Sequence, residues 1–371
     1  RFFLYSRTQI PFKRKVPMQK LIWILFCFVL PMAGNAQITI TAQDMPAAGD
    51  AIRVSRGNTN LAPYGNYPAG ANQVWDFTNV AINRQEVIEY KSSLQTPYIF
   101  YFFTSIGNKI ADTLSILPSN FQLPIQLPIP LALTNVYNFY QAPLFGGNTF
   151  KTTGIGASVS GIPVPAFYED EDELYRFPLN YQDQDTSTFR FKINVPNTFA
   201  YSSTGTRVNI AEGWGIVKTP LGDFECLKIR SIITARDTIA LEQPIQFSLP
   251  FPNNRVEIKY IAKNKDIPVV QLNGISVGNQ TIFNEIIFQD INREPNAVFS
   301  TSATVGCRPF QVTFTSNSER ADNLNWNFGD GTTGTGSPVS HTYYTRGDYP
   351  VTLTASNSFG ADTLRKTVTV A

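Results

Sequence analysis

The chain has 371 residues, enough for two or three domains, and 43% of them are hydrophobic while only 16% are charged. The formal net charge is +2, but residues 1–36 hold six basic and no acidic side chains. Residues 37–371 therefore hold 24 basic and 28 acidic side chains, and this acidic balance excludes a basic nucleic-acid-binding protein. Abundant Phe (28), Tyr (16), Pro (25) and Gly (24) predict an all-β fold of strands and turns.

The first predicted element is a secretory signal peptide with an upstream extension, at 1–36. Lys20 precedes ten apolar residues at 21–30, and Ala36 is a small residue that suits cleavage before Gln37. The apolar run is shorter than the roughly 20 residues that cross a bilayer as a helix. We therefore expect a secreted protein with no membrane span after cleavage.

Residues 37–293 are predicted to form a β-rich domain, either a curved sheet or a sandwich. The sequence Thr219-Pro220-Leu221-Gly222 predicts a type I turn inside a β-hairpin at 213–230. Short helices are expected around 131–141. Runs of β-branched and aromatic residues predict strands at 86–90, 98–103, 188–195, 213–218, 224–230 and 255–262.

Four prolines interrupt the apolar segment 117–133. Because proline cannot donate a hydrogen bond to a sheet, this segment is predicted to be a loop or an edge strand. Two interpretations stay open: a loop packed over the core, or a lid over a site for an apolar ligand.

Five carboxylates follow one another from Glu169 to Glu173. Carboxylate oxygens are the ligands that Ca²⁺ prefers, so the run is a weak candidate for a calcium site. Consecutive residues do not converge on one ion, however, and no glycine lets the chain wrap around it. The preferred interpretation is a solvated acidic loop, and no metal or cofactor is expected. The residues of the run are Glu169, Asp170, Glu171, Asp172 and Glu173.

Other candidate catalytic groups are scarce. His341 is the single histidine, which excludes a two-histidine metal site and leaves a catalytic triad only one candidate base. Cys226 and Cys307, which remain after the leader is removed, are interpreted as buried small hydrophobic residues, although export would permit a disulfide. Two carboxylates facing each other across a cleft, as in glycoside hydrolases, cannot be recognised from spacing alone.

The end of the chain alternates between apolar and polar residues in short runs separated by turn residues, as in an antiparallel β-sandwich. The segment Gly329–Gly334 also spells G-x-G-x-x-G. A phosphate site of that kind needs a helix after the glycines, and here Pro338 and a strand-like run follow. We therefore expect the glycines to supply positive φ in a turn, with Asp330 capping that turn and Trp326 in the core.

The same residues resemble the PKD domain, an immunoglobulin-like β-sandwich of secreted and surface proteins. The resemblance covers 294–371 and rests on 325–331, 340–343 and 347–357. It implies a spacer, adhesion or binding module in which the motif residues are structural. Those residues are Trp326, Phe328, Gly329, Asp330, Gly331, His341, Tyr343, Gly347 and Tyr349.

Residues 37–293 are similar to the amino-terminal part of uncharacterised secreted PKD-domain proteins that are exported by type IX secretion. The similarity lies in 74–79, 134–140, 174–181 and 213–229. It implies a carboxy-terminal sorting tail, and none follows the PKD-like residues. We therefore expect the sequence to be a fragment of a longer reading frame.

The leading hypothesis from the sequence is a monomeric, non-enzymatic adhesion or binding protein, secreted or on the outer surface of a bacterial cell. Its expected partner is an extracellular glycan or protein, with no nucleic acid involved. Two alternatives stay open: a carrier that holds an apolar ligand in 37–293, and a carboxylate-based hydrolase that its PKD domain anchors to the substrate.

Overall fold

The computed structural model describes residues 37–57, 61–102, 115–116, 133–143, 147–159, 161–195, 199–241, 246–278 and 280–371. The predicted signal peptide and all but the last residue of the proline-rich segment lie outside these residues. Within them, no helix is long and apolar enough to cross a membrane. Strands dominate, so the predicted all-β class is confirmed.

The larger part of the fold is one sheet. Its strands are β1 (Ala51–Gly57), β2 (Gly70–Asp76), β3 (Arg84–Tyr90), β4 (Ser115–Ile116), β5 (Leu133–Gln141), β6 (Thr149–Val159), β7 (Ile162–Arg176), β8 (Gln184–Val195), β9 (Phe199–Thr219), β10 (Gly222–Leu241), β11 (Phe247–Pro252), β12 (Arg255–Ala262), β13 (Val270–Val277) and β14 (Gln280–Gln289). Their order is β4-β3-β1-β14-β13-β12-β10-β9-β8-β7-β6-β5, with β11 paired to β10 and β2 paired to β9.

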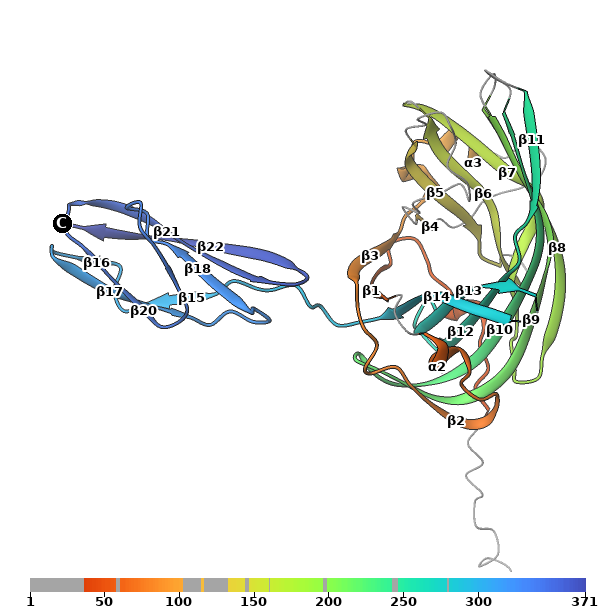
Figure 1. Ribbon diagram of the computed structural model, residues 1–371, viewed down its shortest axis with the longest axis horizontal. Coiled ribbons are helices and arrows are strands. Elements are labelled where there is room, and N and C mark those ends of the chain that lie inside the picture. Colours follow the sequence, from red (N-terminus) through yellow and green to blue (C-terminus); the bar gives the residue numbers. More distant parts are fainter. Residues whose placement is uncertain are drawn as a thin grey trace, which may run out of the picture. The chain divides into compact units, whose positions relative to one another are not determined.

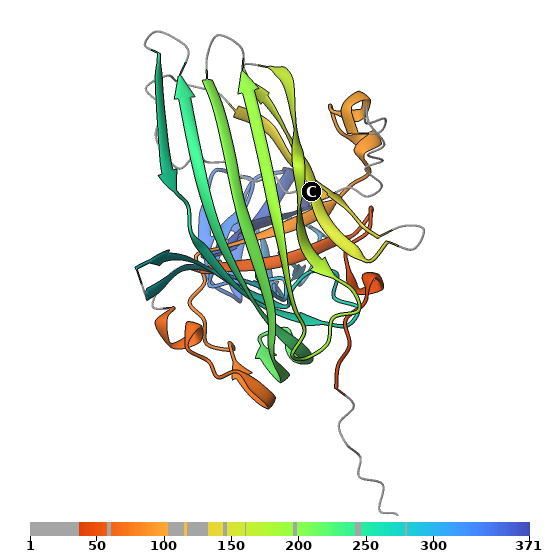
Figure 2. The same ribbon diagram turned by 90° about the vertical axis from the view of Figure 1, so that its right-hand side faces the viewer.

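This large sheet is strongly curved. Figure 1 shows β5 and β6 on one arm of the curve and β1 and β3 on the other, and the end strands β4 and β5 lie close together. Figure 2 shows the long strands β8, β9 and β10 side by side along the twisted wall between the two arms. Twist of one hand accumulates from strand to strand, so a sheet of this many strands curls and gains a hollow face.

The hairpin predicted at 213–230 is present and extends well beyond those bounds. Strands β9 and β10 pair from Thr219 with Gly222 at the turn to Phe199 with Leu241 at the far end. Thr219 holds the connection by accepting a hydrogen bond from the Leu221 amide at its Oγ1. Gly215 of β9 lies where the parallel strand β2 approaches: a Cβ atom there would lie 2.0 Å from the carbonyl oxygen of Gln73. Only glycine leaves room for this pairing.

The described residues include four short helices, one before β1 and three between the strands that follow. They are η1 (Ala42–Asp44), α2 (Ala62–Gly65), η2 (Ser93–Gln95) and α3 (Ile99–Phe102). The strand predicted at 98–103 is wrong, because Ile99–Phe102 is helical. Tyr98 and Phe102, four residues apart, both pack on Phe139 and are buried there. The prediction failed because a short apolar run does not by itself distinguish a helix from a strand.

The short helices predicted around 131–141 are also wrong. Leu133–Gln141 forms strand β5, which pairs with β6 along its length despite two irregularities. Val136, Tyr137, Phe139 and Tyr140 are β-branched or aromatic, and their packing in the sheet outweighs the weak local preference for a helix.

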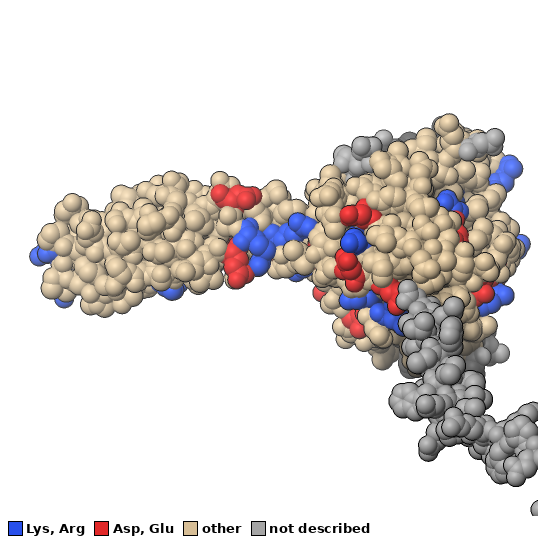
Figure 3. Space-filling model, turned by 90° about the horizontal axis from the view of Figure 1, so that it is seen from below, with Lys and Arg blue, Asp and Glu red and all other residues tan. Residues whose placement is uncertain are grey.

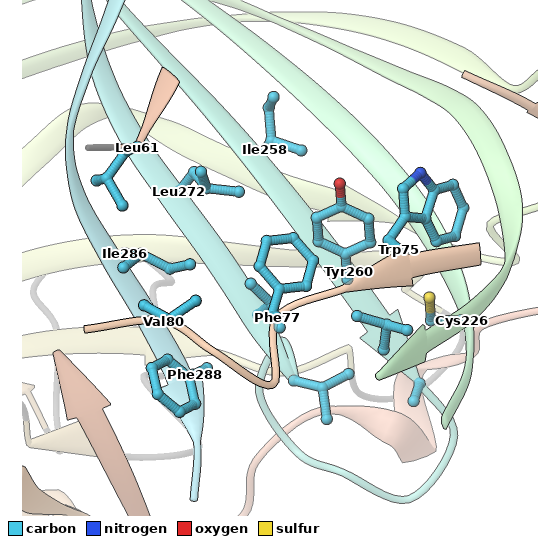
Figure 4. Close-up of a cluster of buried hydrophobic side chains, with 14 residues drawn as sticks. Leu61, Trp75, Phe77, Val80, Cys226, Ile258, Tyr260, Leu272, Ile286 and Phe288 are labelled. Atoms are coloured by element: carbon cyan, nitrogen blue, oxygen red, sulfur yellow. The ribbon is translucent and has the colours of Figure 1, made fainter. Parts of the chain in front are cut away.

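One face of β12, β13 and β14 is covered by β2 and the chain that follows it. Figure 4 shows Trp75, Phe77 and Val80 from this segment lying over Ile258 and Tyr260 of β12 and their neighbours. The Trp75 and Tyr260 rings meet edge to face with centroids 5.0 Å apart. This cluster makes one side of β12 a hydrophobic core.

The remaining strands form two small sheets. They are β15 (Phe299–Thr301), β16 (Val305–Gly306), β17 (Phe310–Ser316), β18 (Asn323–Asn327), β19 (Thr333–Thr335), β20 (Val339–Tyr343), β21 (Gly347–Asn357) and β22 (Gly360–Val370). One sheet has the order β15-β17-β20 and the other β16-β22-β21-β18-β19. Trp326 is 1% exposed between them and contacts Phe299 and Phe314, so the core forms where the sequence predicts it.

Candidate functional site

The alternation of β12 separates two kinds of side chain. Val256, Ile258 and Tyr260 enter the hydrophobic core, so Arg255, Glu257 and Lys259 must lie on the opposite face. That face lines a cavity of about 390 Å³, whose walls come from β1, β3, β5, β6, β7, β9, β12, β13 and β14. The charged side of β12 therefore faces the hollow side of the curved sheet.

Arg207 of β9 is the centre of the charged groups in this cavity. It is 3% exposed, and its Nε and Nη2 donate to the two carboxylate oxygens of Asp172 at 2.8 Å each. Its Nη1 donates to Glu257 at 3.0 Å, and Lys259 Nζ lies 2.5 Å from the same Glu257 oxygen. Buried charges are tolerated when they are paired and hydrogen-bonded in this way.

The surroundings shift the pKa values of these groups. Burial alone would raise the pKa of Glu257, but the charges of Lys259, Arg207 and Arg255 outweigh it and hold the pKa well below its ordinary value. Burial lowers the pKa of Lys259 despite the attraction of Glu257. Burial also raises the pKa values of three phenols around the cavity, which therefore stay neutral at physiological pH: Tyr140, Tyr168 and Tyr175.

A row of polar side chains crosses the same face of the sheet. Asn209, Ser231, Glu257, Asn273 and Glu285 are register partners on the successive strands β9, β10, β12, β13 and β14. Ser231 donates to Asn209 at 2.7 Å, and Asn273 donates to Glu285 at 2.8 Å. Of these five residues, Glu257 lines the cavity, and the register of the sheet extends a polar row from it across the neighbouring strands.

An aromatic wall borders the charges. Phe150 of β6 stacks on Tyr140 of β5 with centroids 5.6 Å apart, and on Tyr175 of β7 at 6.3 Å. Lys259 Nζ lies 5.2 Å from the centroid of the Tyr175 ring. Charged and aromatic surfaces thus meet in one cavity, an arrangement that suits an amphipathic molecule.

The acidic run at 169–173 lies in strand β7, so its interpretation as a solvated loop is wrong. Pairing with β6 and β8 sends neighbouring side chains to different sides of the sheet. Asp172 binds Arg207, Asp170 accepts from Thr188, Glu171 pairs with Lys151 and Glu173 pairs with Arg176. Among the described residues, no group of three or more His, Cys, Asp or Glu could hold a metal ion.

The glycine motif of the carboxy-terminal sheets lies in the connection between β18 and β19. Gly329 and Gly331 have φ of +84° and +91°, and strand β19 rather than a helix follows them. Asp330 Oδ1 accepts hydrogen bonds from the amide and hydroxyl of Thr332, and Oδ2 lies 2.7 Å from His341 Nε2. The motif residues here close a turn.

The other motif residues pack around that turn. The His341 ring stacks on Phe328 at 4.3 Å, and the Tyr343 hydroxyl donates to the Phe328 carbonyl oxygen. Tyr349 stacks on Tyr343 at 4.4 Å, and Gly347 begins β21. Phe328, Tyr343 and Tyr349 therefore belong to the hydrophobic core of the two small sheets.

Replacing Asp330 with alanine is expected to cost about 1–2 kcal/mol of stability at neutral pH, because the turn loses the hydrogen bonds that Asp330 accepts. Burial would raise the pKa of Asp330, but the bonds from Thr332 and His341 lower it overall. This stabilisation is therefore present above the ordinary pKa of 3.8 and is lost as the pH falls through the lowered value. Thermal unfolding at pH 7 and at pH 3 measures it. A difference from wild type that is no smaller at pH 3 would contradict this account.

The two cysteines differ from the sequence prediction. Cys226 is buried as expected, but Cys307 is exposed, and both are free. Cys307 follows the two-residue strand β16, in the connection that leads to β17, where the chain runs over the surface. The prediction that both are buried is thus wrong for Cys307.

The comparison with known families concerns the end of the chain. The sequence model of the family described as PKD domain matches residues 292–371. The comparison with curated proteins gave no match. A solution NMR structure from Methanosarcina mazei is 35% identical over a match that covers 21% of this chain and 53% of that one, with a TM-score of 0.19. Residues 292–371 are therefore a PKD domain.

Proposed function

We propose that this protein is a secreted or cell-surface binding protein, without enzymatic activity, whose large sheet holds a small molecule in its inner cavity. The observation that carries the proposal is the cavity of about 390 Å³ lined by the buried ion pairs of Arg207 and by an aromatic wall. Small-molecule sites in proteins are concave, of this size, and combine an apolar wall with a few fixed polar groups.

The PKD domain supports the extracellular part of the proposal, because it is a module of extracellular-type binding and adhesion proteins. The leader-like sequence at 1–36 and the similarity to proteins of type IX secretion support export by that route. Figure 3 shows few charged side chains on the visible face of the PKD domain, which fits a glycan or an uncharged protein surface as its partner. We propose that this domain attaches the protein to such a partner.

The charged lining changes the ligand expected from the sequence, since an entirely apolar molecule would leave the buried Nε of Arg255 without a hydrogen-bond acceptor. A carboxylate-based hydrolase is less well supported. Its general acid needs a raised pKa, whereas the pKa of Glu257 is lowered. Burial raises the pKa of Asp266, which also lines the cavity. The second carboxylate that such a hydrolase needs would be Glu257, but Glu257 is held by Arg207 and Lys259 and is not free to act.

Filling the cavity tests this proposal. Asn138 of β5 lines the cavity and is only partly buried, so Asn138→Trp adds bulk to the cavity without replacing a core residue. Native mass spectrometry of the wild-type chain, purified without denaturation, is expected to show a small-molecule adduct that the variant has lost.

The matched control is Asn194→Trp, the same substitution at an exposed position of β8 outside the cavity. This variant is expected to keep the adduct. A wild-type protein that carries no adduct, and shows no change in melting temperature with any member of a metabolite library, would contradict the proposed function.

A further inference from the structure

Most of the charged groups that line the cavity are paired with one another. Asp172 and Glu257 contribute two negative charges, which Arg207 and Lys259 balance with two positive ones. Arg56, which also lines the cavity, is matched separately by Glu86 and Glu285. Asp266, whose pKa is raised by burial, also lines the cavity, and Arg255 is the remaining cation of the lining.

Arg255 differs from these paired groups. Its Nε is buried and has no hydrogen-bond partner, and none of the residues that the structure describes forms an ion pair with its guanidinium. Arg207 and Lys259, in contrast, are each within 3.0 Å of a carboxylate oxygen. A buried donor without an acceptor is costly, so Arg255 favours a ligand that brings an acceptor to it.

The rest of the lining indicates what that ligand carries besides the acceptor. Tyr140, Phe150 and Tyr175 present stacked rings, which bind the apolar or aromatic part of a molecule. Ile88 and Ile287 add aliphatic surface from β3 and β14. Neutral phenols beside them donate hydrogen bonds to an anion without repelling it.

We propose that the cavity binds an organic monoanion, a carboxylate on an apolar or aromatic body, with the carboxylate paired to Arg255. The proposal rests on the proposed function, because it names the ligand class of the same cavity. Arg255 offers two parallel N–H groups, the geometry that a carboxylate accepts in a bidentate pair. The pairing supplies an acceptor for the Arg255 guanidinium.

Two matched pairs of probes test the charge of the ligand on the full chain by isothermal titration calorimetry: 3-phenylpropionate against 3-phenylpropionamide, and octanoate against octanamide. We expect each carboxylate to bind about 10- to 100-fold more tightly than its amide, since a buried charge-assisted pair is lost in the amide. Arg255→Gln should remove this preference, and Arg255→Lys should restore part of it.

The matched control is Arg236→Gln, which removes an exposed arginine of β10 outside the cavity and should leave the carboxylate preference unchanged. Near-UV circular dichroism checks that each variant is folded. Amides that bind as tightly as carboxylates, a preference that survives Arg255→Gln in a folded protein, or carboxylates that do not bind at all would each overturn the inference. The proposed function fails separately, when the wild-type chain carries no adduct and no library compound stabilises it.

Discussion

Replacing Arg207 with methionine is expected to destabilise the large sheet by about 3–5 kcal/mol, the largest effect that we predict for a charged side chain. Methionine roughly fills the space of the arginine stem, but Asp172 and Glu257 then lose the cation that lies between them. Both carboxylates would stay in a cavity wall with too few partners. Chemical denaturation of the full chain, with the unfolding of β9 followed by hydrogen exchange, measures the loss.

Arg190→Met is the matched control. The Arg190 side chain is 61% exposed on β8 and lies 3.8 Å from Glu169, so the free energy of unfolding should change by no more than about 0.5 kcal/mol. If Arg207→Met lowered the free energy of unfolding by less than about 1 kcal/mol, the buried ion pairs would not be the stabilising element that we infer.

Replacing Trp326 with alanine should remove about 3–5 kcal/mol from the stability of the PKD domain. The ring is almost fully buried among Phe299 and Phe314, and its Nε1 donates to the Gly336 carbonyl oxygen at 2.8 Å. Alanine leaves a cavity in this core. Hydrogen exchange resolved along 292–371 should show faster exchange throughout β17, β18 and β21.

Tyr344→Ala serves as the control for this prediction. Tyr344 is an aromatic residue of the same domain, 74% exposed, and its removal should leave hydrogen exchange in the core strands unchanged. Faster exchange confined to the neighbours of Trp326 would show that the domain does not unfold as one cooperative unit, against our expectation.

The sequence predicts the strands best where polar and apolar residues alternate. The run at 255–262 is an example: Val256, Ile258 and Tyr260 alternate with charged residues, and β12 forms with those bounds. Prediction failed at 98–103 and 131–141, where apolar runs lack a clear period and packing against distant strands decides the structure.

The charged cavity could not be predicted for a related reason. Charged residues that alternate along a strand usually face water, so the pattern of Glu257 and Lys259 does not indicate that they are buried. They are enclosed because the sheet curves and brings Asp172 and Arg207 from distant strands against them. Sheet curvature is a property of many strands together, and no local pattern in 169–173 or 255–262 contains it.

The two faces of β12 have a consequence for how this protein can diversify. Residues that stabilise the fold and residues that would select the ligand alternate along one strand, with the backbone between them. A substitution at 255, outside the ion pairs that hold 257 and 259, can therefore alter which molecules fit while the packing of 256, 258 and 260 stays as it is. A family built on this strand could change its ligand repertoire without rebuilding its core.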